Sequence, residues 1–276
     1  MYCHHSDGKH VPAKDKDSSS MLAIPESDSY GNIPTLNKFG FLCDEVFIDP
    51  FAKEFVMYAI DSSPSKRTVM EIGAGYGHLS LQVLRSGNHS IIINDLDQGH
   101  LDLIKQRLPH QLRERVEWKR GKFPDDIELY HESVDAIFCR VLQFLSGKDI
   151  EIGFKKMLRW LKPGGRLYLV VPTIYMKDVP LHIRQIFHKK RLSNDKWPGQ
   201  YIESALIYPK EIAKHMPEQV HLFDMDVLVN NLLRASFDIS KVEYFNESFR
   251  GYNDPFGNRQ MVGVVALKPL NAGILS

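Results

Sequence analysis

The sequence predicts an α/β domain built on a mostly parallel sheet, with helices on both faces and an antiparallel last strand. Apolar segments of strand character alternate with amphipathic helical segments from residue 68 onwards. The first of these strands runs directly into a glycine-rich loop, in the stretch TVMEIGAGYGH. Near the carboxyl end, SKVEYF and QMVGVVALKP are strand-like, and no helical period separates them. We expect this pair to be antiparallel, because parallel neighbours need a crossover.

Composition limits the classes of partner. The chain has 276 residues, 43% of them hydrophobic, which is enough to bury a full core. Its formal net charge is +1, so no overall field attracts nucleic acid or an anionic membrane, and we expect neither as a partner. The three cysteines, Cys3, Cys43 and Cys139, are widely spaced and odd in number, which favours a reducing, cytoplasmic location. No apolar run approaches the length of a membrane span.

The chain divides into a tail and one domain. Residues 1–29 are polar and offer little to bury, so we predict a disordered tail. Its histidines match no closed zinc site, and we expect no metal. One domain should extend over residues 30–276. Within it, residues 173–220 are longer than an ordinary link and hold aromatic and basic side chains, which predicts an insert.

The glycine loop indicates a nucleotide-like ligand. Gly73, Gly75 and Gly77 follow the strand at alternate positions and precede an amphipathic helix. Without Cβ atoms such a loop turns sharply and lets a ligand lie against the backbone, while the helix offers unpaired N–H groups at its start. A dinucleotide fingerprint would place its third glycine at position 78, where this chain has His78. The dehydrogenase interpretation is therefore weakened.

Two acidic side chains are placed near this loop. Glu71 lies at the end of an otherwise apolar strand, where an unpaired carboxylate is costly, so it needs a cationic or hydrogen-bonding partner. About twenty residues on, the apolar run 91–93 ends in Asn94 and Asp95. A carboxylate at the tip of the neighbouring strand is positioned to accept hydrogen bonds from both ribose hydroxyls of an adenosine.

The stretch EIGAGYG, followed by NDLD and later by LKPGGRLYLVVP, resembles the class I S-adenosylmethionine (SAM)-dependent methyltransferases over roughly residues 39–269. The resemblance implies their fold, a seven-stranded, mostly parallel sheet with an antiparallel last strand. It also implies SAM as the cofactor, with the SAM α-ammonium as the partner of Glu71. The cofactor-binding residues that it implies are Glu71, Gly73, Ala74, Gly75, Gly77, Asp95, Leu96, Phe123 and Arg140.

The rim that follows RVEWKR departs from the family pattern. Many members have Gly-Asp there, and the Asp accepts a hydrogen bond from adenine, whereas this chain has Lys122 at the second position. A cation cannot accept a hydrogen bond. We therefore expect adenine to be held by a backbone carbonyl, by Asp125 or Asp126, or by apolar contact. Leu96 and Phe123 are the side chains available for that contact.

Caps and periodicity predict the other elements. Asp49, followed by proline, is typical of a helix start. The helix after the glycine loop should end at Gly87, a natural C-cap. Asp97 can cap the next helix and Asp224 a later one. A crossover helix over residues 152–161 should stop at Pro163, before the fifth strand, RLYLVVP.

The methyl acceptor is the open question. After the strand SVDAIFCR, amino-directed DNA and glutamine methyltransferases place an Asn/Asp-Pro-Pro-aromatic run, whereas this chain has CRVLQF. The Pro-Cys nucleophile of cytosine-ring enzymes and the paired glutamates of arginine enzymes are also missing. These absences favour methyl transfer to a small molecule by in-line displacement. A protein side-chain acceptor and a non-catalytic SAM-binding adapter stay open as alternatives.

Candidates for the acceptor side come from three parts of the chain. The family commonly builds its acceptor lid after the fifth strand, so the resemblance assigns residues 173–220 to that role. An oxygen acceptor would need a base, for which His182, His188 and Tyr175 in this insert are candidates. Arg140, at a strand end, should face the transferred methyl group. Phe39 and Phe41 would help to close the site from the amino-terminal side.

Overall fold

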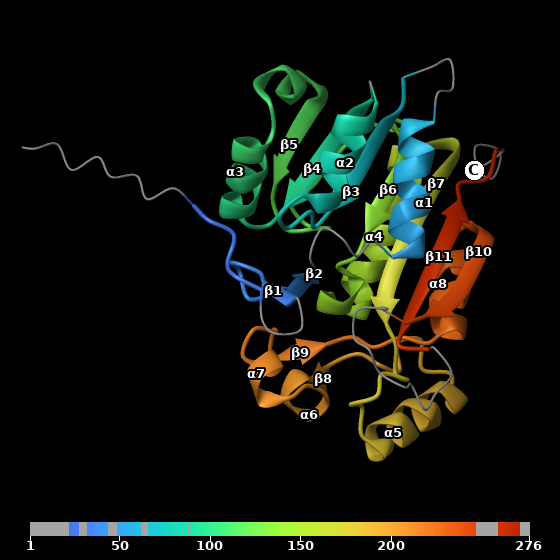
Figure 1. Cartoon of the computed structure of the whole chain (residues 1–276). Helices are drawn as coiled ribbons and strands as arrows, with labels where there is room; N and C mark the ends of the chain where they lie inside the picture. The colour runs from blue at the N-terminus through green and yellow to red at the C-terminus, as the bar shows by residue number, and fades with distance from the viewer. Residues whose placement is uncertain are drawn as a thin grey trace, which may run out of the picture.

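The computed structural model describes residues 22–27, 32–43, 49–61, 66–87, 89–246 and 259–270. Figure 1 shows a central sheet with helices on both sides and a group of shorter elements beyond one end of the strands. Apart from residues 22–27, the predicted disordered tail lies outside the described residues. The domain boundary near residue 30 therefore stays a prediction.

The central sheet has seven strands in the order β10-β11-β7-β6-β3-β4-β5. The neighbours from β5 to β7 pair in parallel, and β11 pairs antiparallel with both β7 and β10. The predicted fold and the predicted antiparallel pairing near the carboxyl end are therefore confirmed. The strands are β3 (Thr68–Ile72), β4 (Ser90–Asp95), β5 (Val116–Arg120), β6 (Val134–Cys139), β7 (Leu161–Pro172), β10 (Asp238–Phe245) and β11 (Met261–Leu267).

Helices cover both faces of this sheet because successive strand residues point to opposite faces. Val69 of β3 joins the core formed with α1, α2 and α3, and the next residue, Met70, joins the core formed with α4 and α8. Both faces of the sheet are therefore buried under helices, as expected for a parallel sheet. The helices are α1 (Pro50–Ile60), α2 (His78–Ser86), α3 (Gln98–Arg107), α4 (Gly147–Trp160) and α8 (Met225–Arg234).

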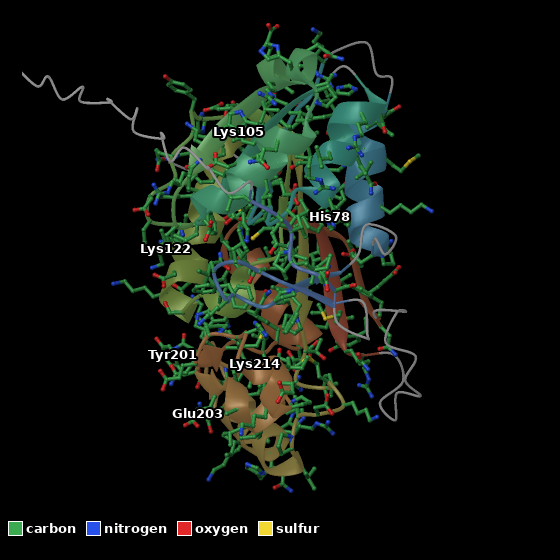
Figure 2. All side chains as sticks on the ribbon, turned by 60° about the vertical axis from the view of Figure 1, so that its left-hand side comes forward. His78, Lys105, Lys122, Tyr201, Glu203 and Lys214 are labelled. Carbon is green, nitrogen blue, oxygen red and sulfur yellow. The ribbon has the colours of Figure 1, made fainter. Side chains whose placement is uncertain are left out.

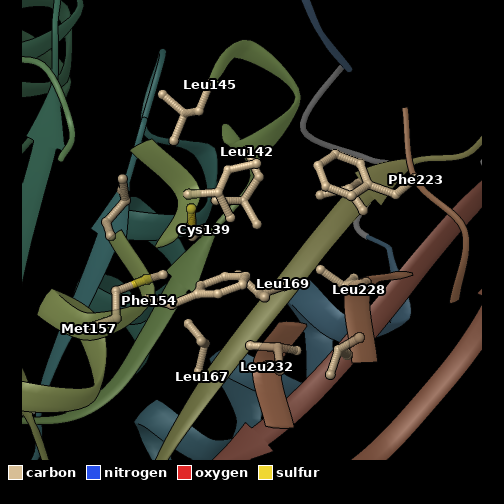
Figure 3. Close-up of a cluster of buried hydrophobic side chains, with 14 of the residues drawn as sticks. Cys139, Leu142, Leu145, Phe154, Met157, Leu167, Leu169, Phe223, Leu228 and Leu232 are labelled. Atoms are coloured by element: carbon tan, nitrogen blue, oxygen red, sulfur yellow. The ribbon is translucent and has the colours of Figure 1, made fainter. Parts of the chain in front are cut away.

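Figure 3 shows the core on the α4 and α8 face. Phe154 of α4 and Leu232 of α8 are buried there with Leu167 and Leu169 of β7. Cys139 of β6 is also fully buried in this core, and burial raises the pKa of its thiol to about 12. Its environment is that of a small core residue, and the thiol stays protonated at neutral pH.

The predicted helix caps are present. The Asp49 carboxylate accepts from the first backbone N–H groups of α1, at 2.9 and 2.8 Å. Asp97 and Asp224 cap α3 and α8 in the same way, and Gly87 is the C-cap residue of α2. The three aspartate caps satisfy N–H groups that have no partner within the helix.

The bounds of the crossover helix differ from the prediction over residues 152–161. The helix is α4, which begins earlier, at Gly147, and ends one residue earlier, at Trp160. Leu161 already pairs with Val134 of β6, and the next pair is Ala136 with Arg166, so the residues between bulge out of the sheet. Sheet pairing of Leu161 therefore ends the helix before the proline does.

Two segments extend beyond the carboxyl ends of the strands (Figure 1). The first, which we call the strap, comprises residues 32–43 and contains the antiparallel pair β1 (Asn32–Pro34) and β2 (Phe41–Cys43). The second is the insert, residues 173–220. It contains α5 (Leu181–Leu192), β8 (Ile202–Glu203), α6 (Ser204–Ile207), α7 (Lys210–Ala213) and β9 (Gln219–Val220). Within the described part of the chain, no helix combines the length and the apolar character needed to cross a bilayer.

Candidate functional site

The glycine loop connects β3 to α2 at the carboxyl end of the sheet. Gly73, Gly75 and Gly77 have φ values of 75°, 53° and 73°, a left-handed region in which a side chain is strained. The N–H groups of Gly73 and Ala74 both donate to the Asn94 carbonyl, at 3.0 and 2.9 Å. These two bonds fix the loop against the end of β4, next to Asp95.

Asp95 lies at the tip of β4 and is almost fully buried. Its Oδ2 accepts a hydrogen bond from the Gly75 N–H at 2.7 Å, and its Oδ1 accepts from the Asp97 N–H at 2.9 Å. The carboxylate is thus tied directly to the glycine loop. Because Oδ1 also contacts the His100 ring, the capacity that remains for a ligand hydroxyl is mainly on Oδ2.

His100 of α3 connects Asp95 to the strap. Its Nδ1 lies 3.0 Å from Asp95 Oδ1, and its Nε2 accepts from the Leu36 N–H at 3.1 Å. Because Nε2 accepts, the ring proton is on Nδ1 and points to the carboxylate. The hydroxyl of Tyr76, in the glycine loop, donates to the Pro34 carbonyl at 2.6 Å. The strap is therefore anchored at two points beside the predicted ribose site.

Glu71 lies beneath the glycine loop and is buried. Its Oε2 accepts a short hydrogen bond from the Ser80 hydroxyl of α2. Desolvation by burial raises the pKa of Glu71 to about 7, and the hydrogen bond from Ser80 opposes that shift. Ser80 thus supplies part of the hydrogen bonding that the Glu71 carboxylate needs. A cation near this carboxylate would act in the same direction as Ser80 and lower the pKa of Glu71.

We expect Glu71→Gln to change how stability depends on pH. In the unfolded chain Glu71 ionises near its ordinary pKa of 4.5, whereas the folded protein holds the proton until about pH 7. The free energy of unfolding of the wild type should therefore fall as pH rises through this window, by roughly 3 kcal/mol for this group. The amide that replaces the carboxyl group cannot ionise, so the variant should escape that loss. Urea denaturation at pH 4 and pH 8 would measure the difference.

The same variant tests the predicted pairing of Glu71 with the SAM ammonium. If SAM brings a cation to Glu71, saturating SAM should raise the free energy of unfolding at pH 8 more for the wild type than for Glu71→Gln. Glu114→Gln, at an exposed position, is the matched control and should behave as the wild type. Equal stabilisation of wild type and Glu71→Gln by SAM would contradict the pairing.

A cavity of about 240 Å³ opens at the carboxyl ends of β3, β4, β5 and β6. Six of the predicted cofactor residues line it, while Glu71, Ala74 and Gly77 lie outside its lining. The six are Gly73, Gly75, Asp95, Leu96, Phe123 and Arg140. Its remaining lining comes mainly from the strap and from the loop after β6, and includes Thr35, Asn37, Phe39, Phe41, Leu42, His100, Val141, Gln143, Phe144 and Leu145.

The cavity lining fits an adenosine cofactor. A Cβ atom built on Gly75 would come within 2.5 Å of the Leu42 side chain, and one on Gly73 within 2.2 Å of Val141. Only glycines leave this cradle open, and their backbone forms one wall. Asp95 offers acceptors for hydroxyl groups, and Leu96 and Phe123 offer apolar surface next to it.

Two basic side chains of the cavity already have partners. Arg140 Nη1 lies 3.2 Å from Oδ2 of Asp49, the cap residue of α1. Lys122 Nζ lies 2.8 Å from Asp125, and in Figure 2 Lys122 is at the margin of the molecule. Lys122 is thus held by an exposed ion pair, which suits the expectation that adenine is recognised by other groups.

The predicted base candidates lie apart from the cavity lining. Tyr175 packs against Tyr244 of β10, with ring centroids 6.0 Å apart, and the Arg259 guanidinium lies 4.8 Å from the Tyr175 ring. His182, on α5, is exposed. The structure therefore brings Arg140 to the cavity, whereas Tyr175 and His182, like the other residues of the insert, lie outside the cavity lining. Among the described residues, no group of three His, Cys, Asp or Glu side chains could hold a metal ion.

Sequence reasoning missed several cavity residues. Phe39 and Phe41 were expected, whereas Leu42, His100 and Phe144 were not. His100 has no local signal, because its role depends on the strap passing over α3.

A second buried histidine supports the loop after β6. The imidazole of His221, which follows the insert, is buried, and burial lowers its pKa to about 4. The backbone N–H of the same residue donates to the Gln143 carbonyl at 2.8 Å. Because Gln143 lines the cavity, this bond helps to fix the cavity wall to the segment that follows the insert.

Comparisons with curated proteins find methyltransferases. The methyltransferase domain family profile matches residues 69–165. The chain is 24% identical over 115 residues to phosphoethanolamine N-methyltransferase 1 of Triticum aestivum, covering 40% of the chain and 22% of that protein. It is 23% identical over 184 residues to demethylmenaquinone methyltransferase of Chlorobaculum tepidum, covering 66% of the chain and 69% of that protein. It thus spans only a small part of the wheat protein and about two thirds of the bacterial one.

Solved structures show the same fold. A SAM-dependent methyltransferase of Methanosarcina mazei superposes with a TM-score of 0.56 at 19% identity, covering 81% of this chain and 99% of that one. One from Mesorhizobium loti gives 0.54 at 18% identity, covering 78% and 97%. The match over the glycine loop and the shared strand arrangement agree with the cavity geometry. The chain therefore resembles the class I SAM-dependent methyltransferases in its matched segment and in its fold, which implies S-adenosylmethionine as the cofactor.

Proposed function

We propose that the protein transfers the methyl group of SAM to a small-molecule acceptor by in-line displacement. The observation that carries this proposal is the cavity itself, which the strap and the loop after β6 line from Asp95 to Phe144. A concave site with mostly apolar walls and a few polar groups is typical of small-molecule binding. The acceptors named for two relatives, phosphoethanolamine and demethylmenaquinone, are likewise small molecules.

The order of the strands determines which residues lie at each end of the cavity. Asp95 ends β4, and Leu96 and Phe123 follow β4 and β5, on one side of β3. Arg140 and Phe144 follow β6, on the other side. With adenosine held at Asp95 and the glycine loop, the methyl-bearing end points toward β6. The acceptor is then placed between the β6 loop and the strap.

The walls of this acceptor end are mainly aromatic and aliphatic. Phe39 of the strap contacts Phe144 edge-on, with ring centroids 5.4 Å apart. Val141 and Leu145 complete the apolar surface, and Gln143 adds a polar group. Such walls exclude water and hold an acceptor in one orientation.

Positioning is what this chain contributes to the chemistry. When bound, SAM supplies an electrophilic methyl group. The acceptor atom forms a new bond to the methyl carbon with its own lone pair, and the electrons of the broken S–C bond stay on sulfur. The strap and the β6 loop would hold the acceptor atom on the far side of that bond. An O–H acceptor also releases a proton. The proposal assigns that proton to no side chain, since neither Tyr175 nor His182 lines the cavity.

We expect Phe144→Ala to separate transfer from cofactor binding. The change removes the aromatic wall of the acceptor end and leaves Asp95 and the glycine loop untouched. SAM affinity by calorimetry should stay within about threefold of wild type, as for changes away from a ligand. Tritium transfer from labelled SAM to a small-molecule fraction of cell extract should fall at least tenfold, which corresponds to roughly 1.4 kcal/mol of transition-state stabilisation. Tyr130→Ala, at a residue 89% exposed, is the control.

The extract assay also decides between the alternatives. Label in the low-molecular-weight fraction supports the proposal, and label confined to proteins would replace it with a protein acceptor. SAM binding without any transfer, in extracts from several sources, would favour the non-catalytic adapter.

A further inference from the structure

His100 forms a hydrogen bond through each of its two ring nitrogens, and the two bonds lead to different walls of the cavity. Nδ1 lies 3.0 Å from Oδ1 of Asp95, at the tip of β4, and Nε2 accepts from the Leu36 N–H of the strap at 3.1 Å. The residue is 1% exposed, and its ring also lines the cavity. Any buried imidazole needs hydrogen-bond partners. What is particular here is that both partners belong to segments that form the cofactor cavity.

Packing fixes the orientation of the His100 ring. The residue is the third of α3 and lies in its first turn. The ring of Tyr76, which is fully buried, meets the imidazole edge-on, with ring centroids 5.1 Å apart. The Tyr76 hydroxyl in turn donates to the Pro34 carbonyl of the strap at 2.6 Å. The imidazole is thus held so that its Nδ1–H points to the carboxylate and its Nε2 points to the strap.

The bonds to Asp95 divide its two oxygens between two tasks. Oδ1 accepts from the Asp97 N–H at 2.9 Å and from the His100 ring, whereas Oδ2 accepts from the Gly75 N–H at 2.7 Å. Two donors on Oδ1 fix the plane of the carboxylate. The remaining capacity of Oδ2 is then presented to the cavity in one direction. A ribose hydroxyl gains from an acceptor that is already oriented.

The same ring carries this effect to the strap. The carboxylate, the imidazole and the Leu36 N–H form a chain of hydrogen bonds, and the members of such a chain polarise one another. A carboxylate that faces Nδ1 makes Nε2 a better acceptor, so the bond to the strap is strongest when the carboxylate is in place. The strap supplies Phe39 and Phe41 to the cavity lining. The ribose site is therefore connected to the wall of the acceptor end.

We propose that His100 is a positioning residue, which orients the Asp95 carboxylate for the ribose hydroxyls of SAM and connects the filled ribose site to the strap. Binding at one end of the cavity then orders the wall at the other end, and by linkage an ordered strap tightens cofactor binding. His100 acts through Asp95 and Leu36, and the proposal gives it no part in the methyl transfer itself. The inference rests on the cofactor placement and goes beyond the proposed acceptor class.

Calorimetry with two ligands tests the role in the ribose site. The ligands are S-adenosylhomocysteine and its analogue that lacks both ribose hydroxyls. We expect His100→Phe, which keeps an aromatic ring, to bind S-adenosylhomocysteine about tenfold more weakly, the effect of roughly one charge-assisted hydrogen bond. Its affinity for the analogue should stay within about twofold of the wild type, because the lost interaction acts only through the hydroxyls. Equal weakening of both ligands would show a merely structural role and would overturn the proposal.

Two further variants separate the hydrogen bonds from the packing. His100→Gln offers an amide that can donate to the carboxylate and accept from the strap, so it should recover most of the wild-type preference for S-adenosylhomocysteine over the analogue. Tyr76→Phe removes the hydroxyl that anchors Pro34 but keeps the ring against His100, so it should retain that preference. A glutamine variant without the preference would contradict the proposal, and so would its loss in Tyr76→Phe.

Hydrogen exchange in the wild type tests the connection to the strap without any substitution. The Leu36 amide, followed by NMR on the full chain, should exchange about threefold or more slowly with saturating S-adenosylhomocysteine than with the saturating analogue. The reason is that only the first ligand places hydroxyls on Asp95. Equal protection by both ligands would overturn the connection. A wild type that bound neither ligand would contradict the cofactor placement itself, so the two failures are distinguishable.

Discussion

Asp95→Ala should weaken SAM binding by about 1.5–3 kcal/mol, because the change removes charge-assisted hydrogen bonds to the ribose hydroxyls. The contacts of Asp95 add a second effect. Its carboxylate also accepts from the Gly75 N–H and from His100, so the variant loses the group that holds the glycine loop and the strap together. Calorimetry with SAM and with S-adenosylhomocysteine should show the same loss, since both carry the ribose.

Asp97→Ala is the control for this prediction. Asp97 lies two residues further along and caps α3, with its Oδ1 2.7 Å from the Gly99 nitrogen. Its removal should cost about 1 kcal/mol of stability through the lost cap, with little change in SAM affinity. If both variants lost SAM binding equally, the effect of Asp95 would come from general loosening of this region, and the ribose assignment would fail.

Gly75→Val should abolish measurable SAM binding. The residue has a φ of 53°, where a β-branched side chain is strained by about 1–2 kcal/mol or more. Its Cβ would lie 2.5 Å from Leu42, so the side chain would be forced toward the cavity or would displace the strap. Either outcome fills or distorts the cofactor cradle. Calorimetry measures the binding, and urea denaturation measures the separate loss of stability.

Gly164→Val distinguishes the two causes. Gly164 has a φ of 75° and lies in the bulge of β7, outside the cavity lining, where the nearest atom to a built Cβ is Leu270 Cδ2 at 3.1 Å. Its substitution introduces comparable backbone strain without touching the site. We expect reduced stability and unchanged SAM affinity. Retained SAM binding in Gly75→Val would show that the cofactor does not lie against this glycine.

The sequence was informative where a single residue type has one physical role. Left-handed backbone at Gly73, Gly75 and Gly77 excludes most side chains, so the loop was recognisable from its letters alone. Asp95 could be placed at the cavity because it ends the strand next to the glycine-loop strand, where a carboxylate can accept hydrogen bonds from ribose hydroxyls. Local caps such as Asp49 follow the same logic, since cap and helix are adjacent in the chain.

Features that depend on contacts between distant segments were not predictable in this way. The end of α4 is set by pairing of Leu161 with Val134, and no local pattern around the proline reveals that pairing. Likewise, the path of the insert takes Tyr175 toward Tyr244 rather than to the cavity. The sequence shows that the insert is rich in aromatic and basic residues, but the side to which each one points is a tertiary property.

The contact between strap and insert has a consequence for biosynthesis. Gly40 of the strap donates its N–H to the His215 carbonyl at 2.8 Å, and the rings of Phe41 and His215 lie edge-on at 5.2 Å. These partners come from opposite halves of the chain. A growing chain exposes the strap early, long before the ribosome has produced His215, so the cavity can acquire its complete roof only late in translation. Until then the strap's apolar residues lack their final partners, and such exposed apolar surface is what makes an incomplete chain prone to aggregate.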